Sequence, residues 1–320
     1  MNLLGIDIGG TKTAVSLGDE AGNILYSKRM PTLHDVEAYR EALIGLCRDV
    51  VKEAGLTLKD VGAAGISAPG PLSVPLGLLL APVNNPTFVD MPIVQIVRDG
   101  LGLPVYFNND ANAAVLAEWY FGAYRGTPNL IYLTFSTGMG GGVIVNGRLL
   151  QGNADAAGEF GHMVVDYNGP LEKGKKPGTW ESYVGGRAVA ERIKARIRVE
   201  GIRTAIVDKA GGNIDDISMR AVTEAYRAGD AFAREVWDEL LERLAQGLGI
   251  VIMAFNPDVI LLGTMAIRER DIVMPELEKR LPAYGWDNSL AGCRIDTSSL
   301  GDRIGEMAGL AVAVCGVRGV

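Results

Sequence analysis

A short apolar strand followed by a glycine turn and a second strand constrains the fold of this chain most, and the pattern occurs twice. Asn2 to Asp7 is apolar and stops at Gly9-Gly10, and Lys12 to Leu17 continues as a strand. Leu130 to Phe135 is also apolar and β-rich, and the glycine-rich turn Ser136 to Gly142 precedes another strand. This weak internal duplication predicts two α/β domains facing a cleft.

The remaining elements follow from apolar periodicity and from glycine stops. Further strands are predicted at Asn23–Lys28, Val61–Ile66, Val105–Phe107, Gly142–Val145 and Val259–Leu262. Helices are predicted at Val36–Ala54, Ile93–Leu101, Asp110–Phe121, Gly185–Val199, Met219–Tyr226, Ala231–Phe255 and Ile304–Val314. We expect the domain boundary inside or just after the helix that starts at Asp110.

Length and composition exclude several classes of protein. A chain of 320 residues is long enough for about two domains. The net charge of −7 and the lack of a long basic run argue against nucleic acid and anionic membranes as partners. Three cysteines, Cys47, Cys293 and Cys315, lie far apart, which argues against a disulfide scaffold. With no signal-peptide pattern and no long apolar run, we expect a cytoplasmic protein.

The first glycine turn has the composition of a phosphate-binding loop. Gly9 and Gly10 allow positive φ and a close approach of phosphate to backbone N–H groups, Thr11 adds a hydroxyl and Lys12 a positive charge. Asp7, at the end of an apolar strand, needs a metal, water or a donor beside it. The alternative is a tight hairpin turn, but Asp-x-Gly-Gly-Thr-Lys is more specific than a bare Gly-Gly.

The second turn, Ser136 to Gly142, presents small residues and N–H groups between strands. Two such loops, one in each domain, could hold a single triphosphate from both sides. Glycine-rich loops are common, so a flexible hairpin remains the alternative here.

Asn109-Asp110 opens a predicted helix, and Asp110 lies at its cap or in its first turn. The helix field would keep the pKa of this carboxyl low. In phosphoryl transfer one carboxylate accepts the proton of the attacking hydroxyl. Taken alone, Asp110 is more simply explained as a helix cap.

Glu159 and His162 lie three residues apart, with small residues around them, in Ala157-Gly158-Glu159-Phe160-Gly161-His162. Such a pair can hydrogen-bond adjacent hydroxyl groups of a sugar. A lone Glu and His are more often surface or core groups, and His34, the other histidine, has no supporting context.

Together these motifs resemble the ROK family of actin-like, hexokinase-like phosphotransferases, and the match keeps its order along nearly the whole chain. The resemblance is carried by Asp7 to Lys12, Ala68-Pro69-Gly70-Pro71, Asn109-Asp110, Ser136 to Gly142, Gly158 to His162, Glu181, and Asn256-Pro257 to Gly263. It implies a two-domain, ribonuclease H-like ATPase fold with a central cleft. The N-terminal α/β domain would cover residues 1–117, completed by a C-terminal helix at about 303–320, and the larger domain residues 118–302.

The resemblance also implies the roles of individual residues. Asp7 would position Mg²⁺ through the phosphates or water, and Asp110 would be the base that activates the 6-hydroxyl of the sugar. ATP would be bound by Gly9, Gly10, Thr11, Lys12, Thr137, Gly138, Gly263 and Thr264. The sugar would contact Gly70, Asn84, Asn109, Asp110, Glu159, His162 and Glu181. Relatives are often dimers, so a homodimer is expected by analogy.

The chain departs from the family at its structural zinc site. The family's three cysteine positions hold Glu172, Gly174 and Thr179. A closed zinc site needs about four ligands, mostly thiolate or imidazole, and His162 alone does not supply them. We therefore predict no zinc. The loop of residues 172–179 would then be held by packing, with Trp180 as the expected contact. Asp155 stands where the family tends to have glycine.

The leading hypothesis is an ATP-dependent, glucokinase-like hexose 6-phosphotransferase. An N-acetylmannosamine or N-acetylglucosamine kinase and a polyol kinase are alternatives within the class, since both departures touch the sugar side. A sugar-responsive transcription regulator would need a helix-turn-helix segment, and the phosphate loop at Asp7 leaves no room before it. A silent sugar-binding protein would not need Asp7, Lys12 and Asp110 together.

Overall fold

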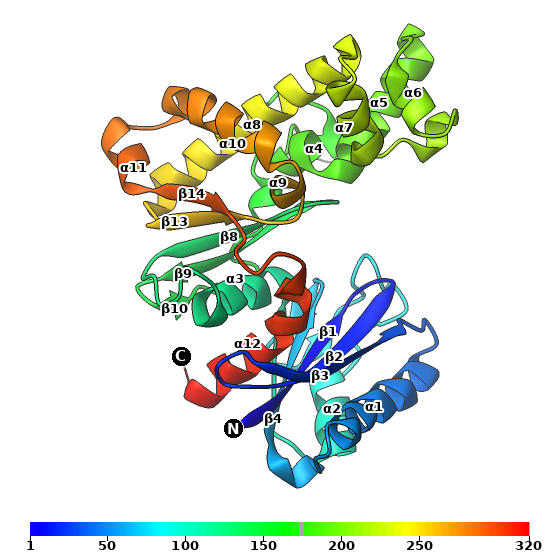
Figure 1. Ribbon diagram of the computed structural model, residues 1–320, viewed down its shortest axis with the longest axis vertical. Coiled ribbons are helices and arrows are strands. Elements are labelled where there is room, and N and C mark those ends of the chain that lie inside the picture. Colours follow the sequence, from blue (N-terminus) through cyan, green and yellow to red (C-terminus); the bar gives the residue numbers. More distant parts are fainter. Residues whose placement is uncertain (173–175, 320) are drawn as a thin grey trace. The chain divides into compact units, whose positions relative to one another are not determined.

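The computed structural model describes residues 1–172 and 176–319 (Figure 1). Contacts within the chain divide it into two compact units. The first unit comprises residues 1–132, 142–158 and 298–320, and the second comprises residues 133–141 and 159–297. The domain boundaries expected from the sequence, at residues 117 and 302, stay a prediction beside this division.

The first unit is built on a five-stranded sheet with the order β3-β2-β1-β4-β7 (Figure 1). Its strands are β1 (Asn2–Ile8), β2 (Lys12–Asp19), β3 (Ile24–Pro31), β4 (Val61–Ala68) and β7 (Val105–Asn109). The pairs β1–β2 and β2–β3 are antiparallel, whereas β4 pairs in parallel with both β1 and β7. The carboxyl ends of β1, β4 and β7 therefore meet at one edge.

Helices pack on both faces of this sheet. They are α1 (Val36–Glu53), α2 (Ile93–Leu101), α3 (Asp110–Phe121) and α12 (Ile304–Arg318). Apolar residues of α1 and α2 form one core with the sheet. On the other face α12 lies so close that a Cβ on Gly65 would be 2.2 Å from the carbonyl oxygen of Gly309. Glycine on both elements thus sets the depth at which α12 packs.

A buried carboxylate fixes the chain as it enters the last helix. Glu118, on α3, is fully buried, and it accepts hydrogen bonds from the hydroxyls of Ser298 and Ser299 and from the backbone N–H of Leu300. These donors satisfy both carboxylate oxygens, as burial of a charged group requires. They hold the segment that leads to α12.

The second sheet has the order β10-β9-β8-β13-β14. Its strands are β8 (Leu130–Phe135), β9 (Met139–Val145), β10 (Arg148–Leu149), β13 (Val259–Leu262) and β14 (Arg294–Thr297). Two small hairpins add β5 (Leu72–Ser73) with β6 (Leu78–Leu79) and β11 (Leu171–Glu172) with β12 (Lys176–Pro177). β13 and β14 run parallel and β9 and β10 antiparallel.

Most helices of the second unit surround α8, which is 25 residues long. The helices are α4 (Trp180–Val184), α5 (Gly186–Glu200), α6 (Ala205–Lys209), α7 (Met219–Arg227), α8 (Ala231–Phe255), α9 (Met265–Arg268), α10 (Arg270–Arg280) and α11 (Asp287–Gly292). Asp230 caps α8 by accepting the N–H of Ala233 at 2.8 Å, and Asn256 ends it in the left-handed conformation. These are the ordinary start and stop residues of a helix.

The elements with clear periodicity match the sequence prediction, and weaker ones were missed. Ile93–Leu101, Asp110–Phe121 and Ala231–Phe255 are helices with the predicted bounds. The sequence did not reveal α10, which contains Pro275, or β14, whose residues are exposed or half-buried. Neither carries the apolar pattern on which the prediction rests.

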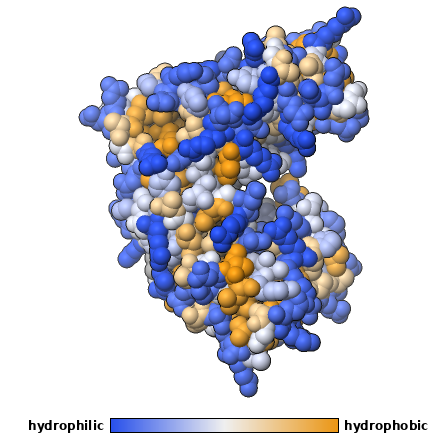
Figure 2. All heavy atoms as spheres, viewed as in Figure 1, coloured by the Kyte–Doolittle hydropathy of each residue, from blue (hydrophilic) through white to orange (hydrophobic). Residues whose placement is uncertain are grey.

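The surface of the molecule is mixed in character. The face in Figure 2 shows apolar residues in separate patches among hydrophilic ones. None of the helices formed by residues 1–172 and 176–319 combines the length and the apolar character that crossing a bilayer demands.

Candidate functional site

The parallel strands of the first unit bring three predicted residues to one edge of the sheet. The register pairs Asp7 of β1 with Ser67 of β4, and Ala68 of β4 with Asn109 of β7. The Ser67 hydroxyl donates a hydrogen bond of 3.0 Å to Asp7 Oδ1. Asp7 and Asn109-Asp110, a hundred residues apart in sequence, thus belong to one end of the sheet.

The Asp7 carboxyl is unusually hard to ionise. Its pKa is raised to about 6, mainly by burial and also by the negative charge of Asp110, while the hydrogen bond from Ser67 and the charges of Lys12 and Arg29 act in the opposite direction. A cation beside this carboxylate would relieve both causes of the raised pKa. Hard oxygen donors of this kind, together with phosphate oxygens, are what Mg²⁺ prefers. The donor chemistry at Asp7 therefore fits Mg²⁺.

The structure separates the helix cap from the predicted base. Asn109 is the N-cap of α3, because its Oδ1 accepts the N–H of Asn112 at 2.7 Å. Asp110 is the first residue of the helix, its side chain is exposed, and its Oδ1 accepts the N–H of Ala111 at 2.8 Å. The capping role considered for Asp110 belongs to Asn109, so a carboxylate stands at the positive end of the helix without being its cap.

The first glycine turn uses its glycines for space. Neither Gly9 nor Gly10 has a positive φ. The N–H of Gly9 donates to the carbonyl of Lys12 at 2.9 Å, and a Cβ on Gly10 would be 2.7 Å from Cβ of Asn84. Thr11, Lys12 and Asn84 are exposed. Gly10 therefore lets the loop that carries Asn84 lie against the turn.

Sequence reasoning missed a residue that supports this turn. Asn85 is fully buried and its amide donates to the carbonyl of Gly9 at 3.4 Å, while its Oδ1 has no hydrogen-bond partner among the described residues. Thr32 also donates to the Gly9 carbonyl, at 2.8 Å. Only the tertiary contact identifies the role of Asn85, because the sequence alone does not distinguish it from the adjacent Asn84.

The second glycine turn is bonded to two helices of its own unit. The N–H groups of Gly186 and Arg187, at the start of α5, donate to the carbonyls of Ser136 and Thr137 at 2.9 and 3.1 Å. From α4, Glu181 Oε2 accepts the N–H of Met139 at 2.8 Å. A Cβ on Gly138 would be 2.6 Å from this same oxygen. The turn is therefore held on one side by Glu181, one of the predicted sugar ligands.

The other two predicted ligands of this unit lie beside Glu181. Glu159 precedes a single turn of 3₁₀ helix that ends at His162. Glu159 Oε2 lies 3.9 Å from His162 Nε2, and both side chains are about half exposed. Within this turn a Cβ on Gly161 would be 2.1 Å from the carbonyl oxygen of Met139 and 3.2 Å from Cβ of Glu181. Gly161 thereby brings Glu159, His162 and Glu181 into one neighbourhood.

A cavity of about 850 Å³ opens next to the second glycine turn, entirely within the second unit. Thr137 and Thr264, both predicted from the sequence, line it, and α5, α7 and α9 supply most of the remaining wall. Gly138 and Gly263 are not part of the lining; the N–H of Gly263 donates to the carbonyl of Leu133 at 2.9 Å. The cavity is large enough for a nucleoside.

The sequence did not reveal the cationic side chains of this cavity. Lys194 and Arg227 line it but are paired with Glu191 and Glu269 at 2.8 and 2.9 Å. Arg187 and Arg268 also line it, and within the described part of the chain neither has a side-chain hydrogen bond or ion pair. A helix start marked by Gly185-Gly186 and the single arginine of α9 were the signals available, and neither points to a ligand by itself.

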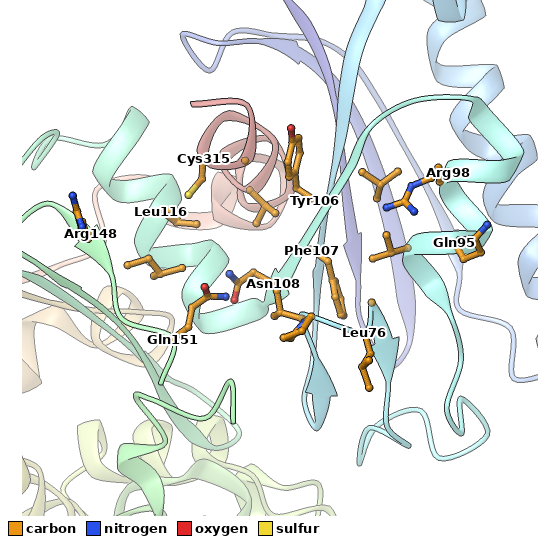
Figure 3. Close-up of a pocket in the computed structure, with 18 residues that line it drawn as sticks. Leu76, Gln95, Arg98, Tyr106, Phe107, Asn108, Leu116, Arg148, Gln151 and Cys315 are labelled. Carbon is orange, nitrogen blue, oxygen red and sulfur yellow. The ribbon is translucent and has the colours of Figure 1, made fainter. Parts of the chain in front are cut away.

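A second cavity, of about 530 Å³, lies in the first unit along the free edge of β7 (Figure 3). Tyr106, Phe107 and Asn108 of β7 line it together with Gln95 and Arg98 of α2, Leu116 of α3, Arg148 of β10 and Cys315 of α12. None of the residues predicted to bind sugar or nucleotide is in its wall. The predicted site and this cavity are therefore distinct.

The donors present at the family's zinc position do not fit zinc. Thr179 is fully buried and its hydroxyl accepts the N–H of Ser182 at 3.3 Å as the cap of α4. Gly174 lies outside the described residues. Across residues 1–172 and 176–319, no three His, Cys, Asp or Glu side chains are grouped so that they could hold a metal. The absence of zinc from the protein itself stays a prediction for metal analysis.

The second departure from the family has a local explanation. Asp155 has a φ of 54°, in the left-handed region that favours glycine. Its Oδ2 accepts the backbone N–H of Val74 at 3.0 Å. The hydrogen bond offsets part of the backbone strain that a non-glycine residue carries there.

Comparison with known proteins places these motifs in one group. The model of the ROK family matches residues 3–314. Glucokinase of Thermotoga maritima is 31% identical over 287 residues, which cover 89% of this chain and 88% of that protein. The structure of ROK hexokinase from Thermus thermophilus superposes with a TM-score of 0.84 at 28% identity, with both chains covered completely. A ROK family glucokinase from Streptomyces griseus, in complex with glucose and AMPPNP, gives 0.77 at 29% identity and covers 98% of this chain and 99% of its own.

Proposed function

This chain belongs to the ROK family, has the two-domain actin-like ATPase fold and is a sugar kinase, and we propose that it transfers the γ-phosphoryl group of ATP to the 6-hydroxyl of a hexose. The observation that carries the proposal is the exposed carboxylate of Asp110 at the N-terminus of α3, on the same sheet edge as Asp7. The glucose and AMPPNP bound by the Streptomyces griseus relative support both substrates.

Asp110 is the proposed general base. Its carboxylate accepts the proton of the sugar hydroxyl as the oxygen attacks the γ-phosphorus, while the bond from that phosphorus to the β-bridging oxygen breaks and ADP leaves. Asn109 supplies the N-cap bond of α3, and the exposed carboxylate of Asp110 stands in the first turn of that helix. Proton transfer of this kind contributes about a hundredfold or more to the rate.

Asp7 is the proposed residue for Mg²⁺. The bound metal would neutralise charge that develops on the phosphates. The residue's own contribution is a carboxylate whose pKa is raised by burial, so that a nearby cation would favour its ionised form. The hydrogen bond from Ser67 fixes one of its oxygens, so the carboxyl group has a defined orientation.

The two glycine turns are the proposed phosphate ligands. Thr11 and Lys12 bring a hydroxyl and a cation from the first unit, and Gly9 and Gly10 let the chain turn closely enough. In the second unit, Thr137 and Gly138 are the proposed phosphate ligands, with the hydroxyl from Thr137.

We propose that the adjacent cavity of about 850 Å³ takes the adenosine. Thr264 lies in its wall and Gly263 directly precedes it. Arg187 and Arg268, unpaired among the described residues, would meet the ribose or the phosphates.

Seven residues are the proposed sugar ligands. Gly70, Asn84, Asn109 and Asp110 belong to the first unit, and Glu159, His162 and Glu181 belong to the second. The cluster of Glu159, His162 and Glu181 around Gly161 offers two carboxylates and an imidazole, which suits adjacent hydroxyl groups.

A kinase assay over hexoses, N-acetylhexosamines and polyols with ATP·Mg²⁺ tests the substrate class. Highest kcat/KM for a hexose phosphorylated at O6 is expected. Preference for N-acetylmannosamine, N-acetylglucosamine or a polyol would overturn the hexose assignment and leave the kinase chemistry in place.

The variant Asp110→Asn tests the base. It should bind sugar with unchanged affinity in calorimetry and lose kcat by about a hundredfold or more. Asp35→Asn is a matched control, because Asp35 is an exposed residue that caps α1. Near-normal turnover in Asp110→Asn would remove Asp110 as the base.

A further inference from the structure

The segment that would carry zinc in the family is closed here by contacts between its two ends. The N–H of Trp180 donates to the carbonyl of Met163 at 2.7 Å, and the N–H groups of Val165 and Asp166 donate to the carbonyl of Gly178 at 2.9 and 3.2 Å. The first stretch directly follows His162, and the second directly precedes Glu181. Whatever holds these two stretches therefore holds two proposed sugar ligands.

One carboxylate joins the segment to two helices. Asp166 Oδ2 accepts hydrogen bonds from the hydroxyl of Tyr183 on α4 at 2.8 Å and from Arg243 on α8 at 2.9 Å. Its Oδ1 accepts the N–H of Asn168 at 3.0 Å. The Tyr183 hydroxyl, followed by the Asn168 N–H and the charge of Arg243, holds the pKa of Asp166 below its usual value. The carboxylate therefore stays ionised at neutral pH.

Arg243 makes four separate contacts in this region. Besides Asp166, its guanidinium donates to Gln246 Oε1 at 2.9 Å and lies 4.6 Å above the ring of Tyr183. Its backbone carbonyl accepts the indole N–H of Trp180 at 2.8 Å. Such a fork of bonds and stacking is specific to arginine, and lysine does not reproduce it.

Gln246 and Gly247 complete the attachment to α8. The Gln246 amide donates to the carbonyl of Val165 at 3.0 Å. Trp180 is fully buried against Gly247, where a Cβ would be 2.0 Å from the indole ring. One turn of α8 thus receives both ends of the segment, through Val165 and Asp166 on one side and Trp180 on the other.

We propose that Asp166, Tyr183, Arg243 and Gln246, here termed the Arg243 clamp, are positioning residues that hold His162 and Glu181 for the sugar in place of a bound metal. The inference rests on the proposed function in one respect, that His162 and Glu181 contact the sugar. The clamp ties both flanks of the segment to α8, as a metal would tie them to each other.

The energetics favour a role in position over a role in global stability. The side chains of Asp166 and Arg243 are about a quarter exposed, and ion pairs near the surface add little to the free energy of unfolding. Displacement of a substrate-binding group by a fraction of an ångström, in contrast, is costly in catalysis. Loss of the clamp should therefore change sugar binding more than it changes the melting temperature.

Three variants and a matched control test the clamp. Asp166→Asn removes the charge, Tyr183→Phe removes one hydroxyl and keeps the ring under Arg243, and Asp166→Glu is the conservative replacement. Asp215→Asn is the control, because Asp215 pairs with Arg198 at an exposed site of the same unit. Hydrogen exchange of peptides covering residues 159–183, KM for sugar and for ATP, and zinc content are measured on the full chain.

Asp166→Asn should speed exchange in residues 159–183 and raise KM for sugar about tenfold, with KM for ATP changed less than about twofold. Tyr183→Phe should change exchange and KM for sugar in the same direction by less. Asp166→Glu should restore both in part, and Asp215→Asn should change neither. The untreated protein should contain no stoichiometric zinc.

Unchanged exchange in Asp166→Asn, an unchanged KM for sugar, or stoichiometric zinc would each overturn the proposal. Equal changes in both KM values would also overturn it, since general destabilisation has that signature. If the wild-type protein phosphorylates none of the sugars, the proposed function is lost, and the exchange result still decides whether the clamp holds the segment.

Discussion

The two glycine turns look alike in sequence and differ in how the molecule holds them. The first turn, Gly9-Gly10, lies against exposed Asn84 and is followed by exposed Thr11 and Lys12. The second turn, Ser136 to Gly142, is bonded to the start of α5 and to Glu181, and it borders the cavity of about 850 Å³.

Two turns with a similar sequence pattern need not respond equally to substitution. The first turn is held through the Gly9 carbonyl by Thr32 and buried Asn85. At Gly10 it meets a proposed sugar ligand most closely at the Cβ and backbone of Asn84. The neighbours of the second turn are already used in hydrogen bonds, so a small displacement propagates to Glu181. Substitutions of the same kind in the two turns should therefore have unequal effects.

The largest effect is expected for Gly138→Ala. Its Cβ would be 2.6 Å from Glu181 Oε2, which is held by the Met139 N–H, so Glu181 must move. We expect kcat/KM for sugar to fall about a hundredfold. Steady-state kinetics measure it, with Gly292→Ala as control, because a Cβ there meets nothing within 4 Å. A loss below about threefold would show that Glu181 does not act on the sugar.

The next effect is expected for Lys12→Gln, which removes the cation of the first turn. The charge acts on the phosphates in the transition state, so kcat/KM for ATP should fall about twentyfold, less than for a fully buried donor. Lys59→Gln, at another exposed lysine of the same unit, is the control. Normal ATP kinetics in Lys12→Gln would indicate that the first turn is a structural hairpin and does not bind phosphate.

Gly10→Ala is the direct counterpart of Gly138→Ala and should be milder. The new Cβ would be 2.7 Å from Cβ of Asn84 and 3.2 Å from its carbonyl oxygen, so the backbone there must shift, whereas the polar end of the exposed Asn84 side chain can readjust. We expect KM for sugar to rise about fivefold, as a small misplacement of one ligand implies. Gly45→Ala, with open space around it, is the control. An effect equal to that of Gly138→Ala would remove the contrast between the turns.

Arg187→Ala tests the role of the cavity wall independently of the turn beside it. Because Arg187 lies at the exposed start of α5, its loss should raise KM for ATP only about threefold and leave KM for sugar unchanged. Arg203→Ala, an exposed residue of the same unit, is the control. A change confined to the sugar would argue that the cavity takes no nucleotide.

The smallest effect concerns pH and the Arg243 clamp. The pKa of Asp166 is lowered in the folded state, so its contribution to stability is present above its ordinary value of 3.8 and is lost as pH falls through the lower folded value. The difference in melting temperature between wild type and Asp166→Asn should therefore shrink below about pH 4. Thermal unfolding from pH 3 to pH 7 measures it, and a difference that grows towards acid pH would contradict the ionised pair.

The sequence by itself determined the order of the motifs, the family and most regular elements. Asp7 before Gly9-Gly10, Asn109-Asp110 at a helix start and the helix Ala231–Phe255 were all evident, because local periodicity and residue chemistry act over a few neighbours. The same local view could not separate the cap from the base at Asn109-Asp110, since either side chain can accept a helix N–H.

Only the tertiary structure decided which distant groups meet. Ser67 beside Asp7, Arg187 and Arg268 in one cavity wall, and Arg243 between Asp166 and Trp180 depend on strand register and helix packing across many tens of residues. A linear sequence holds no distance between such residues, because burial and hydrogen bonding are set by the folded arrangement. The segment that lacks the family's cysteines is where this matters most: the sequence showed what was missing, and the fold shows what holds it.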